Sequence, residues 1–461
     1  MKLKKFIAII GLLWGLCFTA YATEPITNLI WIIGDGMGPE IMGFFMEGAR
    51  YGNLQGYGSK VSHMERMIQE GTQGLFFNNT YNTIVTDSAA SATQMATGVL
   101  SIPETIGVDY NGKPVETLME LAKKQGKSIG IISDAYVTDA TPACFTAHTA
   151  KRGNRRDIAR QQIKLGVDVI SGGGLKYFNT DENQHLLEEA TAQGYQVALD
   201  RKDLNKITSG KLLGLFSEAG MPPAVEMYQH PQIPSLWDQT KKAIALLEQN
   251  KKGFVLMVEA GKIDWSAHAN DAGGVLAEMK VIDEVISLAR DYADKHPGTL
   301  VYVNADHDTG LGTFVYHHLD SNQAAHKTEQ GEMLYGGNTY YADFRTYKLL
   351  EKQKRSLHSL AQELHAIPME RRTPDYIQRR LSEGLGYVVD ISQFDNVRDI
   401  NGLFKQLNRL YGLSWATGNH SAAPLISIAY GAQAERFGGV YHNTDIFPRL
   451  KDAFGWTERK K

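Results

Sequence analysis

The stretch Leu29-Ile30-Trp31-Ile32-Ile33-Gly34-Asp35-Gly36 decides the fold. Five consecutive apolar residues, three of them β-branched, are typical of a strand that is buried on both faces, as strands of parallel sheets are. The run ends at a carboxylate between two glycines. Because ligands bind beyond the carboxyl ends of strands in open parallel sheets, Asp35 is a candidate site residue, although the same tripeptide is also typical of an ordinary turn.

Four more apolar runs of the same kind follow along the chain, and we expect each to be a buried parallel strand. They cover residues 128–132, 254–258, 299–303 and 425–429. Stretches with helical spacing lie between them, at residues 115–125, 157–165, 236–250 and 275–293. This alternation predicts an α/β fold with a doubly wound, mostly parallel central sheet and helices on both faces.

One long segment, residues 314–413, lacks this alternation. It is richer in charged residues and glutamine, with helical patterns at 345–365 and 375–383 and no convincing buried strand. We therefore expect a peripheral, mostly helical insertion in a single domain that spans residues 23–461. The length of 461 residues would also allow about three domains.

The first 22 residues have the pattern of an export signal. Lys2, Lys4 and Lys5 precede an apolar run at 6–18, and Ala20 and Ala22 fit a cleavage site after Ala22. The run is shorter than the roughly 20 residues that span a bilayer, so we expect a periplasmic or secreted protein without a membrane anchor. Cys144 would then be the single cysteine of the mature chain, a buried and unreactive thiol.

The balance of charges excludes one class of partner. The chain has 48 basic and 51 acidic residues and a formal net charge of -3, without strong segregation. Proteins that bind the phosphate backbone of nucleic acids usually carry a basic surface. We therefore do not expect nucleic acid to be a specific partner.

Carboxylates follow three of the predicted strands. Asp35 follows the first, Glu259 the run at 254–258, and Asp306-His307 the run at 299–303. Unpaired carboxylates at one sheet edge would repel one another, so such a cluster indicates bound cations. Taken singly, Glu259 is also typical of a salt-bridged strand end, and Asp306-His307 of surface polarity.

Two further segments add potential metal ligands. Asp264 and His268 stand four residues apart, which places both on one face of a helix. A carboxylate and an imidazole suit Zn²⁺. His420 lies in a turn directly before the run at 425–429 and is another candidate.

A serine and an arginine are candidates for the remaining chemistry. Ser88 opens a stretch of small residues, where a helix N-terminus would favour an anion, although a plain N-cap serine has the same pattern. No separate histidine is placed by sequence to act as its base, but a bound metal lowers the pKa of a hydroxyl. Arg152, eleven residues after Thr141, could hold two phosphate oxygens.

Taken together, these segments resemble the alkaline phosphatase family. The resemblance runs from residue 28 to residue 456 apart from the insertion, and its motifs occur in family order. They are Asp87-Ser88-Ala-Ala-Ser-Ala-Thr, Asp139-Ala-Thr141-Pro142-Ala, Glu259 through His268, Asp306-His307 and Gly418-Asn-His420-Ser.

The resemblance implies a phosphomonoesterase of broad specificity with two Zn²⁺ and one Mg²⁺. The first zinc would be bound by Asp264, His268 and His420, the second by Asp35, Asp306 and His307, and the magnesium by Asp35, Thr141 and Glu259. Ser88 would attack phosphorus in line and form a phosphoserine, and Arg152 would clamp the phosphate. The zinc ions would stabilise the attacking and departing oxygens. Asp139 and Trp265 would lie beside the ligands without binding a metal.

One position departs from the best-known enterobacterial pattern, and one segment corresponds to a part that varies within the family. Trp265 stands where the best-known enterobacterial form has a lysine, which bears on phosphate affinity and on the preference of the third metal site. Residues 314–413 lie between ligands and correspond to variable loops that overhang the site or a dimer interface. His317, His318 and His326 could bind an extra metal there, although solvated loop histidines have the same pattern.

Two alternatives stay open. A phosphodiesterase of the same superfamily would usually carry a threonine nucleophile and lack the arginine clamp. A non-catalytic periplasmic protein that binds metal or phosphate would usually have lost a ligand or the nucleophile. A sulfatase is disfavoured, because the residues after Ser88 lack the proline and arginine that its modified residue needs. The resemblance also implies a homodimer.

Overall fold

The computed structural model describes residues 24–58, 60–179, 185–318, 324–327, 333–337, 339–340, 342–392 and 394–457. The predicted export signal at residues 1–22 and the side chain of His326 lie outside the described part. Within that part, no helix combines the length and the apolar composition that crossing a membrane requires.

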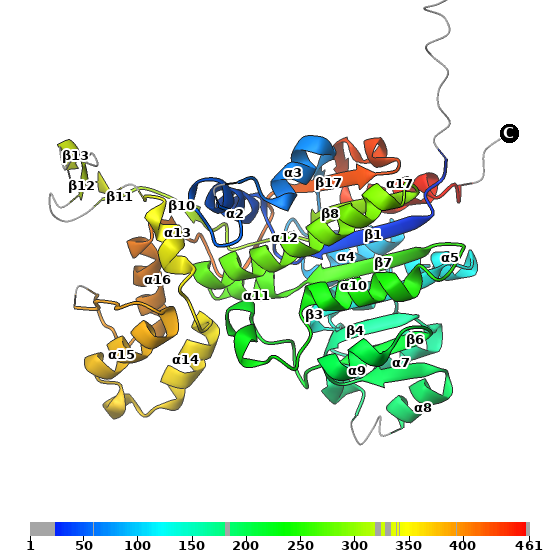
Figure 1. Cartoon of the computed structure of the whole chain (residues 1–461), viewed down its shortest axis with the longest axis horizontal. Coiled ribbons are helices and arrows are strands. Elements are labelled where there is room, and N and C mark those ends of the chain that lie inside the picture. Colours follow the sequence, from blue (N-terminus) through cyan, green and yellow to red (C-terminus); the bar gives the residue numbers. More distant parts are fainter. Residues whose placement is uncertain are drawn as a thin grey trace, which may run out of the picture.

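A ten-stranded sheet forms the centre of the molecule (Figure 1). The order of its strands is β18-β2-β17-β8-β1-β7-β3-β4-β6-β5. Their bounds are β1 Asn28–Gly34, β2 Thr72–Phe77, β3 Ser128–Tyr136, β4 Val169–Gly173, β5 Tyr195–Ala198, β6 Lys211–Leu215, β7 Phe254–Ala260, β8 Thr299–Ala305, β17 Leu425–Gly431 and β18 Gly439–His442.

Strand β1 lies in the middle of the sheet, parallel to β7 on one side and β8 on the other. Residues Leu29 to Ile33 are fully buried, as the apolar run predicts. The indole of Trp31 donates a hydrogen bond to Asn304 Oδ1 at 2.6 Å and packs edge-on against Phe145 and Tyr302. Strand β1 is therefore the central strand with which β7 and β8, the other two strands that carry site residues, pair directly.

The expectation that residues 425–429 form a parallel strand is wrong. Strand β17 runs antiparallel to both β8 and β2, in a sheet whose other paired strands are parallel. The reason is the position of His420, which precedes β17. A strand that starts beside the site, at the edge where the parallel strands end, must run in the opposite direction.

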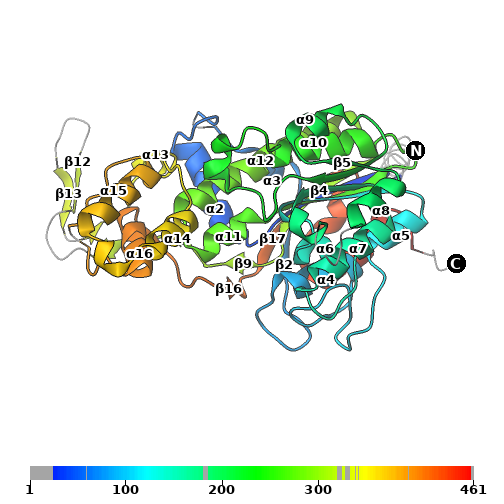
Figure 2. The same ribbon diagram turned by 90° about the horizontal axis from the view of Figure 1, so that it is seen from below.

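Helices cover both faces of the sheet, as expected for a doubly wound fold. Figure 2 shows α3, α9, α10 and α12 on one side, and α4, α5, α6, α7 and α8 on the other. The bounds are α2 Pro39–Tyr51, α3 His63–Glu70, α4 Ser88–Thr97, α5 Leu118–Lys124, α6 Ala140–Cys144, α7 Arg155–Leu165, α8 Leu186–Ala192, α9 Arg201–Lys206, α10 Leu236–Leu247, α11 Lys262–His268, α12 Ala272–Lys295 and α17 Ile446–Ala453.

The segment at 314–413 lies at one end of the molecule (Figure 1). Its helices are α13 Arg345–Leu350, α14 Leu357–Ala366, α15 Pro374–Leu385 and α16 Ile400–Leu410. The predicted helix at 345–365 is broken, because Ser356 caps a new helix by accepting a hydrogen bond from Ser359 N. The segment also contains short strands, which the sequence did not indicate.

These short strands pair only with one another or with the flanks of the segment. The pairs are β10 Thr313–Phe314 with β15 Leu413–Ser414, β11 His317–His318 with β14 Thr339–Tyr340, and β12 Ala324–Lys327 with β13 Met333–Gly337. A fourth ribbon, β9 Asp308–Thr309 with β16 His420–Ser421, brings the chain back to the main sheet. The two ends of the segment at 314–413 therefore lie next to each other where they join the rest of the domain.

Candidate active site

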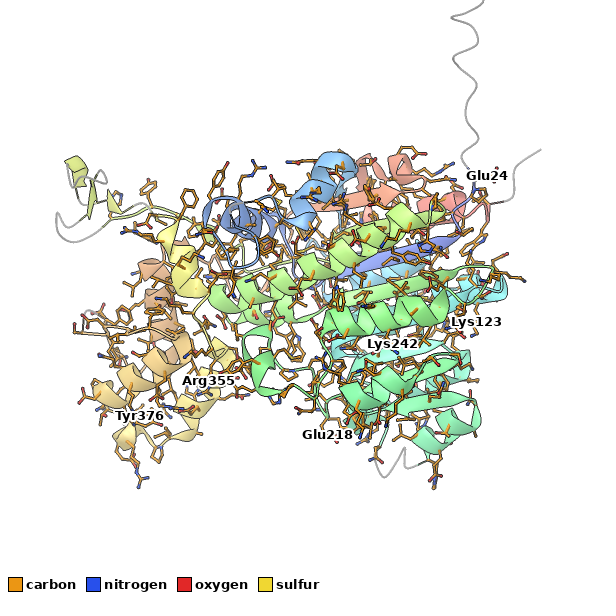
Figure 3. All side chains as sticks on the ribbon, in the orientation of Figure 1. Glu24, Lys123, Glu218, Lys242, Arg355 and Tyr376 are labelled. Atoms are coloured by element: carbon orange, nitrogen blue, oxygen red, sulfur yellow. The ribbon has the colours of Figure 1, made fainter. Side chains whose placement is uncertain are left out.

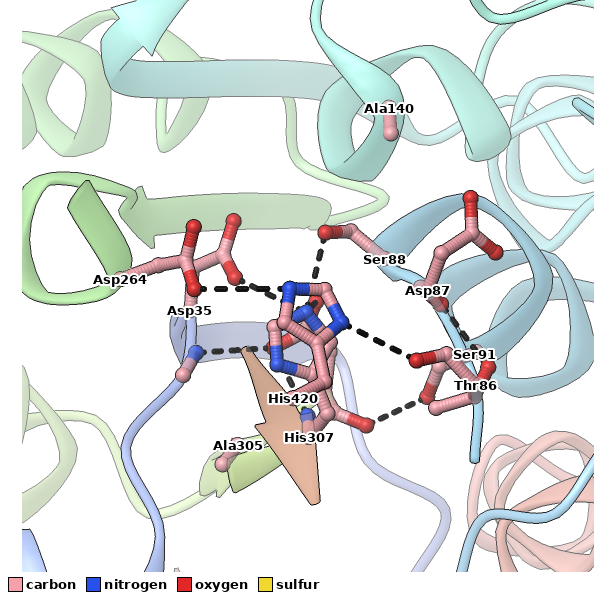
Figure 4. Close-up of polar contacts among 12 residues, drawn as sticks. Asp35, Thr86, Asp87, Ser88, Ser91, Ala140, Asp264, Ala305, His307 and His420 are labelled. Atoms are coloured by element: carbon pink, nitrogen blue, oxygen red, sulfur yellow. Dashed lines mark hydrogen bonds and ion pairs between the residues drawn. The ribbon is translucent and has the colours of Figure 1, made fainter. Parts of the chain in front are cut away.

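The carboxyl edge of the central sheet gathers most of the candidate residues. Asp35 follows β1, Glu259 is the penultimate residue of β7, and Asp306 and His307 follow β8. Ile33 pairs with both Glu259 and Asn304, so the three strand ends are level with one another. Figure 4 shows Asp35, Asp264, His307 and His420 converging in front of Ser88, although these five residues come from five separate segments.

Asp264, His268 and His420 form the first cluster. His268 Nε2 lies 3.3 Å from Asp264 Oδ2 and 3.2 Å from His420 Nε2. Each imidazole uses its other nitrogen on a backbone carbonyl, His268 on Gly418 O at 2.7 Å and His420 on Thr86 O at 3.0 Å. With Nδ1–H donating to a carbonyl, loss of the proton on Nε2 exposes a lone pair there, and two such nitrogens with a carboxylate are a metal-ligand arrangement.

The pKa values in this cluster follow from the same contacts. Burial alone would raise the pKa of Asp264, but the hydrogen bond from His268 and the nearby imidazoles bring it to about 2. The hydrogen bond to Asp264 raises the pKa of His268 to about 9. The protein without metal therefore holds a proton between the two groups.

Asp35, Asp306 and His307 form the second cluster. His307 Nε2 lies 3.3 Å from Asp35 Oδ1 and 3.3 Å from Asp306 Oδ2. The other oxygen of Asp306, Oδ1, accepts hydrogen bonds from Gly36 N and His307 N, which fixes the carboxylate. Burial lowers the pKa of His307 to about 4, so its ring is neutral.

Ser88 stands where the two clusters meet. It is the first residue of α4, whose N-cap is Asp87 and whose ten residues are all buried. Its Oγ lies 3.0 Å from His307 Nε2, and the rings of His307 and His420 stack with centroids 3.6 Å apart (Figure 4). The small side chains of α4 let the helix pack closely enough to bring its N-terminus to the sheet edge.

Arg152 is held beside Ser88 by two carboxylates. Its Nη1 lies 3.2 Å from Asp87 Oδ2, and its Nη2 lies 3.3 Å from Asp139 Oδ1. Asp139 is shared with Arg155, whose Nη2 lies 2.8 Å away and whose guanidinium lies over the ring of Tyr136. The guanidinium of Arg152 is thus oriented by the residue that precedes Ser88.

Glu259 lies close enough to Asp35 for their charges to interact, and the Thr141 hydroxyl contacts Glu259. Glu259 accepts a hydrogen bond from the Ser133 hydroxyl. Burial and then the charge of Asp139 raise the pKa of Glu259 well above its usual range, which the hydroxyls of Ser133 and Thr141 partly counter. Thr141 is buried in α6, which Asp139 caps.

Both clusters fit divalent cations. Potential ligand atoms lie within 4.8 Å of one another in two groups. One is the second cluster, Asp35, Asp306 and His307, and in the other His307 joins Asp264 and His420 of the first cluster. Asp35 Oδ1 and Asp306 Oδ2 are buried without a hydrogen-bond partner. Burial and neighbouring carboxylates raise the pKa of Asp35 well above its usual range. Bound cations would satisfy these oxygens and remove the repulsion.

We compared the chain with known protein families. The family described as "Alkaline phosphatase" matches residues 26–455. The chain belongs to the alkaline phosphatase family. Members of the family are phosphomonoester hydrolases that depend on metal ions, so the chain is a phosphoric monoester hydrolase.

Individual alkaline phosphatases agree with this membership. "Alkaline phosphatase 4" of Bacillus subtilis is 32% identical, covering 92% of this chain and 89% of its own length. A cold-active alkaline phosphatase from Shewanella sp. is 31% identical with a TM-score of 0.75, covering 93% of this chain and 99% of its own. The alkaline phosphatase of Thermus thermophilus, at 24% identity and a TM-score of 0.80, covers 96% of each chain and shows the same fold.

Several residues that position the site were not singled out by sequence reasoning. Thr309 Oγ1 donates to Asp264 Oδ1 at 2.6 Å, Ser133 contacts Glu259, and Arg155 anchors Asp139. Asp87 could have been found as an N-cap residue, but its contact with Arg152 joins segments 65 residues apart. Cys144 is buried, and burial raises the pKa of its thiol to about 12, as an unreactive cysteine requires.

Proposed function

We propose that Ser88 is the nucleophile and that it forms a phosphoserine with the phosphoryl group of the substrate. The observation that carries this proposal is the 3.0 Å contact of Ser88 Oγ with the buried, neutral His307 at the junction of the two clusters. The buried N-terminus of α4 favours an oxyanion at Ser88.

Asp264, His268 and His420 would hold one Zn²⁺, and Asp35, Asp306 and His307 the other. Their mixed nitrogen and oxygen donors suit zinc, whereas the oxygen atoms of Asp35, Thr141 and Glu259 suit Mg²⁺. Metal ions bound at such sites lower the pKa of a hydroxyl or water and stabilise charge on the oxygens of an in-line displacement.

Different residues of the chain then bind the phosphate and face the departing alcohol. Arg152, fixed by Asp87 and Asp139, holds two phosphate oxygens and orients phosphorus toward Ser88. In-line attack requires the alcohol to leave opposite Ser88, at the side of Asp264, His268 and His420. Water that enters at that side hydrolyses the phosphoserine and restores the Ser88 hydroxyl.

The test is steady-state hydrolysis of p-nitrophenyl phosphate at alkaline pH with Zn²⁺ and Mg²⁺. We expect Ser88→Ala to lower kcat by at least about 10³-fold. Ser101→Ala is the matched control, because Ser101 is a buried, hydrogen-bonded serine away from the clusters. Retention of most activity in Ser88→Ala would refute the nucleophile, and faster hydrolysis of bis-p-nitrophenyl phosphate would favour a phosphodiesterase.

Three further proposals rest on sequence and family. Residues 1–22 would direct export to the periplasm or the medium and be cleaved after Ala22. Residues 23–461 would fold as one domain with the segment at 314–413 as its insertion, and two copies would form a homodimer. N-terminal sequencing of the purified protein and its mass in solution test these proposals.

A further inference from the structure

A cavity of about 530 Å³ opens next to the first cluster. His268 and Trp265 of α11 line it, as do residues 219–223, which follow β6. The start of α14, from the segment at 314–413, contributes Ser356, His358 and Ser359. Arg355 and Glu218, both labelled in Figure 3, mark the two segments that flank it. The volume is in the range of cavities that hold small molecules.

The location of this cavity follows from the proposed function. In-line attack by Ser88 sends the alcohol toward Asp264, His268 and His420, and the cavity begins at His268. The side chain of His268 is 38% exposed, whereas that of Asp264 on the same helix is 8% exposed. The leaving alcohol therefore emerges at the cavity.

The walls suit a flat ring. Met221, Pro222 and Pro223 line the cavity together with Trp265. Trp265 is held in place, because Lys262 Nζ lies 3.7 Å from its ring centroid and a Cβ at Gly220 would come within 2.8 Å of its Cη2. An immobilised indole offers stacking area at little entropic cost.

The polar lining contains three carboxyl groups and one amine. Glu226, Asp271 and Glu278 are its carboxylates, and Lys262 is its ammonium group. Asp271 uses both oxygens on Gln353, Gly274 and Leu357, whereas Glu226 uses only Oε1, on Ser356. A negatively charged alcohol portion would meet the Glu226 carboxylate in this lining.

We propose that this cavity is a leaving-group subsite, which receives the alcohol portion of the monoester when that portion carries a ring and no negative charge. Trp265 and the two prolines contact the ring, and Glu226 favours a neutral or cationic substituent. The inference rests on the proposed function, since it places the leaving group by in-line attack from Ser88. It narrows the broad specificity that the family resemblance implies.

The first test fills the cavity. Ala219 is an exposed residue of the lining, so Ala219→Trp should reduce the space without entering the core. We expect kcat/KM for 2-naphthyl phosphate to fall about tenfold relative to that for ethyl phosphate. Gln229→Trp is the matched control, because Gln229 is exposed and outside the lining. Comparing each substrate between variant and wild type cancels the intrinsic reactivity of the leaving groups.

The second test changes charge alone. Glu226→Gln keeps an oxygen for the hydrogen bonds from Ser356. We expect kcat/KM for 4-(trimethylammonio)phenyl phosphate to fall by about threefold to tenfold and that for 4-carboxyphenyl phosphate to rise. Glu218→Gln, an exposed carboxylate of the same loop outside the lining, should leave both unchanged.

The outcomes separate the two proposals. Failure of the wild type to hydrolyse ethyl phosphate would overturn the proposed function. Hydrolysis of all substrates, with unchanged ratios in both Ala219→Trp and Glu226→Gln, would overturn the subsite alone. Competitive inhibition by inorganic phosphate, measured in each variant, shows whether the phosphate site is intact. If Ala219→Trp does not fold, the result for Glu226→Gln alone tests the leaving-group subsite.

Discussion

Asp87 connects the nucleophile to the phosphate clamp through one side chain. Its Oδ1 accepts a hydrogen bond from Ala90 N at 2.9 Å and thereby caps α4. Its Oδ2 accepts from Glu104 N at 3.0 Å and from Arg152 Nη1 at 3.2 Å. The start of the helix and the orientation of the guanidinium are therefore set together.

Substituting Asp87 should separate these two roles. Asp87→Asn keeps an oxygen for the cap but turns an amide toward Arg152, which loses an ion pair. We expect KM for p-nitrophenyl phosphate and the inhibition constant of phosphate to rise about fivefold to tenfold, with a stability loss of about 1 kcal/mol. An unchanged inhibition constant for phosphate would contradict the proposed orientation of Arg152.

Thr309 should control metal affinity without binding a metal. Its hydroxyl donates to Asp264 Oδ1, and Thr309→Val removes this donor with little change in shape. We expect zinc affinity, measured by competition with a chelator, to fall about tenfold to a hundredfold. Thr240→Val, which removes a buried hydroxyl bonded to Leu236 O, is the control and should leave zinc affinity unchanged.

At the residue scale, sequence could indicate which polar residues end the strands but not what holds them. Asp35, Glu259 and Asp306 follow apolar runs, so their meeting at one edge follows from parallel pairing. The partners Thr309, Ser133 and Arg155 come from segments whose positions depend on the finished fold. A hydroxyl or guanidinium that contacts a carboxylate across the chain leaves no local pattern in the sequence.

At the scale of elements, β17 shows how a pattern can be read correctly and oriented wrongly. An apolar run indicates a buried strand but carries no direction. The neighbouring motif indicates the direction of the strand. His420 precedes its apolar run, whereas Asp35, Glu259 and Asp306 stand at or after the ends of their apolar runs. If all four residues meet at one edge, the strand after His420 must be reversed, and this inference was available from the sequence.

Asp271 joins α12 to the segment at 314–413. It caps α12 by accepting from Gly274 N at 2.9 Å, and it also accepts from Gln353 Nε2 and Leu357 N, both at 2.7 Å. Since all of these donors are buried, Asp271→Ala should lower the free energy of unfolding by about 2–4 kcal/mol.

Denaturant unfolding of the variants measures this effect. Asp399→Ala is the control, because Asp399 precedes α16 in the same way but makes no capping hydrogen bond with its side chain. We expect a change of less than about 0.5 kcal/mol for the control. Equal losses in the two variants would show that Asp271 does not anchor the segment.

At the scale of the whole molecule, the stability of the metal-free protein should fall between pH 6.5 and 8. Burial raises the pKa of Glu278 to about 8, and Asp264 raises that of His268 to about 9. A raised pKa in the folded state gives stability that is complete below the pKa of the unfolded chain and lost as pH rises toward the folded value. Both groups therefore act in the same direction in this interval.

We expect a loss of about 2 kcal/mol over this interval, since solvent screens part of the contribution of His268. Thermal unfolding in the presence of a chelator measures it. Added Zn²⁺ should remove the contribution of His268, and Glu278→Gln should remove that of Glu278. A chelated protein whose Tm is constant between pH 6.5 and 8 would refute the prediction.

The architecture of the body could be predicted from the sequence, but that of the segment at 314–413 only in part. The body repeats a buried strand and an amphipathic helix, and this repetition is what a doubly wound sheet requires. The segment has strands of two to five residues, too short for an alternating pattern to be recognised. Its helix break at Ser356 depends on Asp271 and Gly384, which lie outside the broken helix.

The reversed strand also has a consequence for the order in which the chain can fold as it is synthesised. Strand β2, at Thr72–Phe77, pairs with β17 and β18, which begin at Leu425 and Gly439. About 350 residues therefore leave the ribosome before β2 acquires a neighbour, and the same wait applies to His420 and the ligands that it meets. Contacts of such long range form slowly, so the central strands can assemble early while this flank of the sheet and the complete site form last.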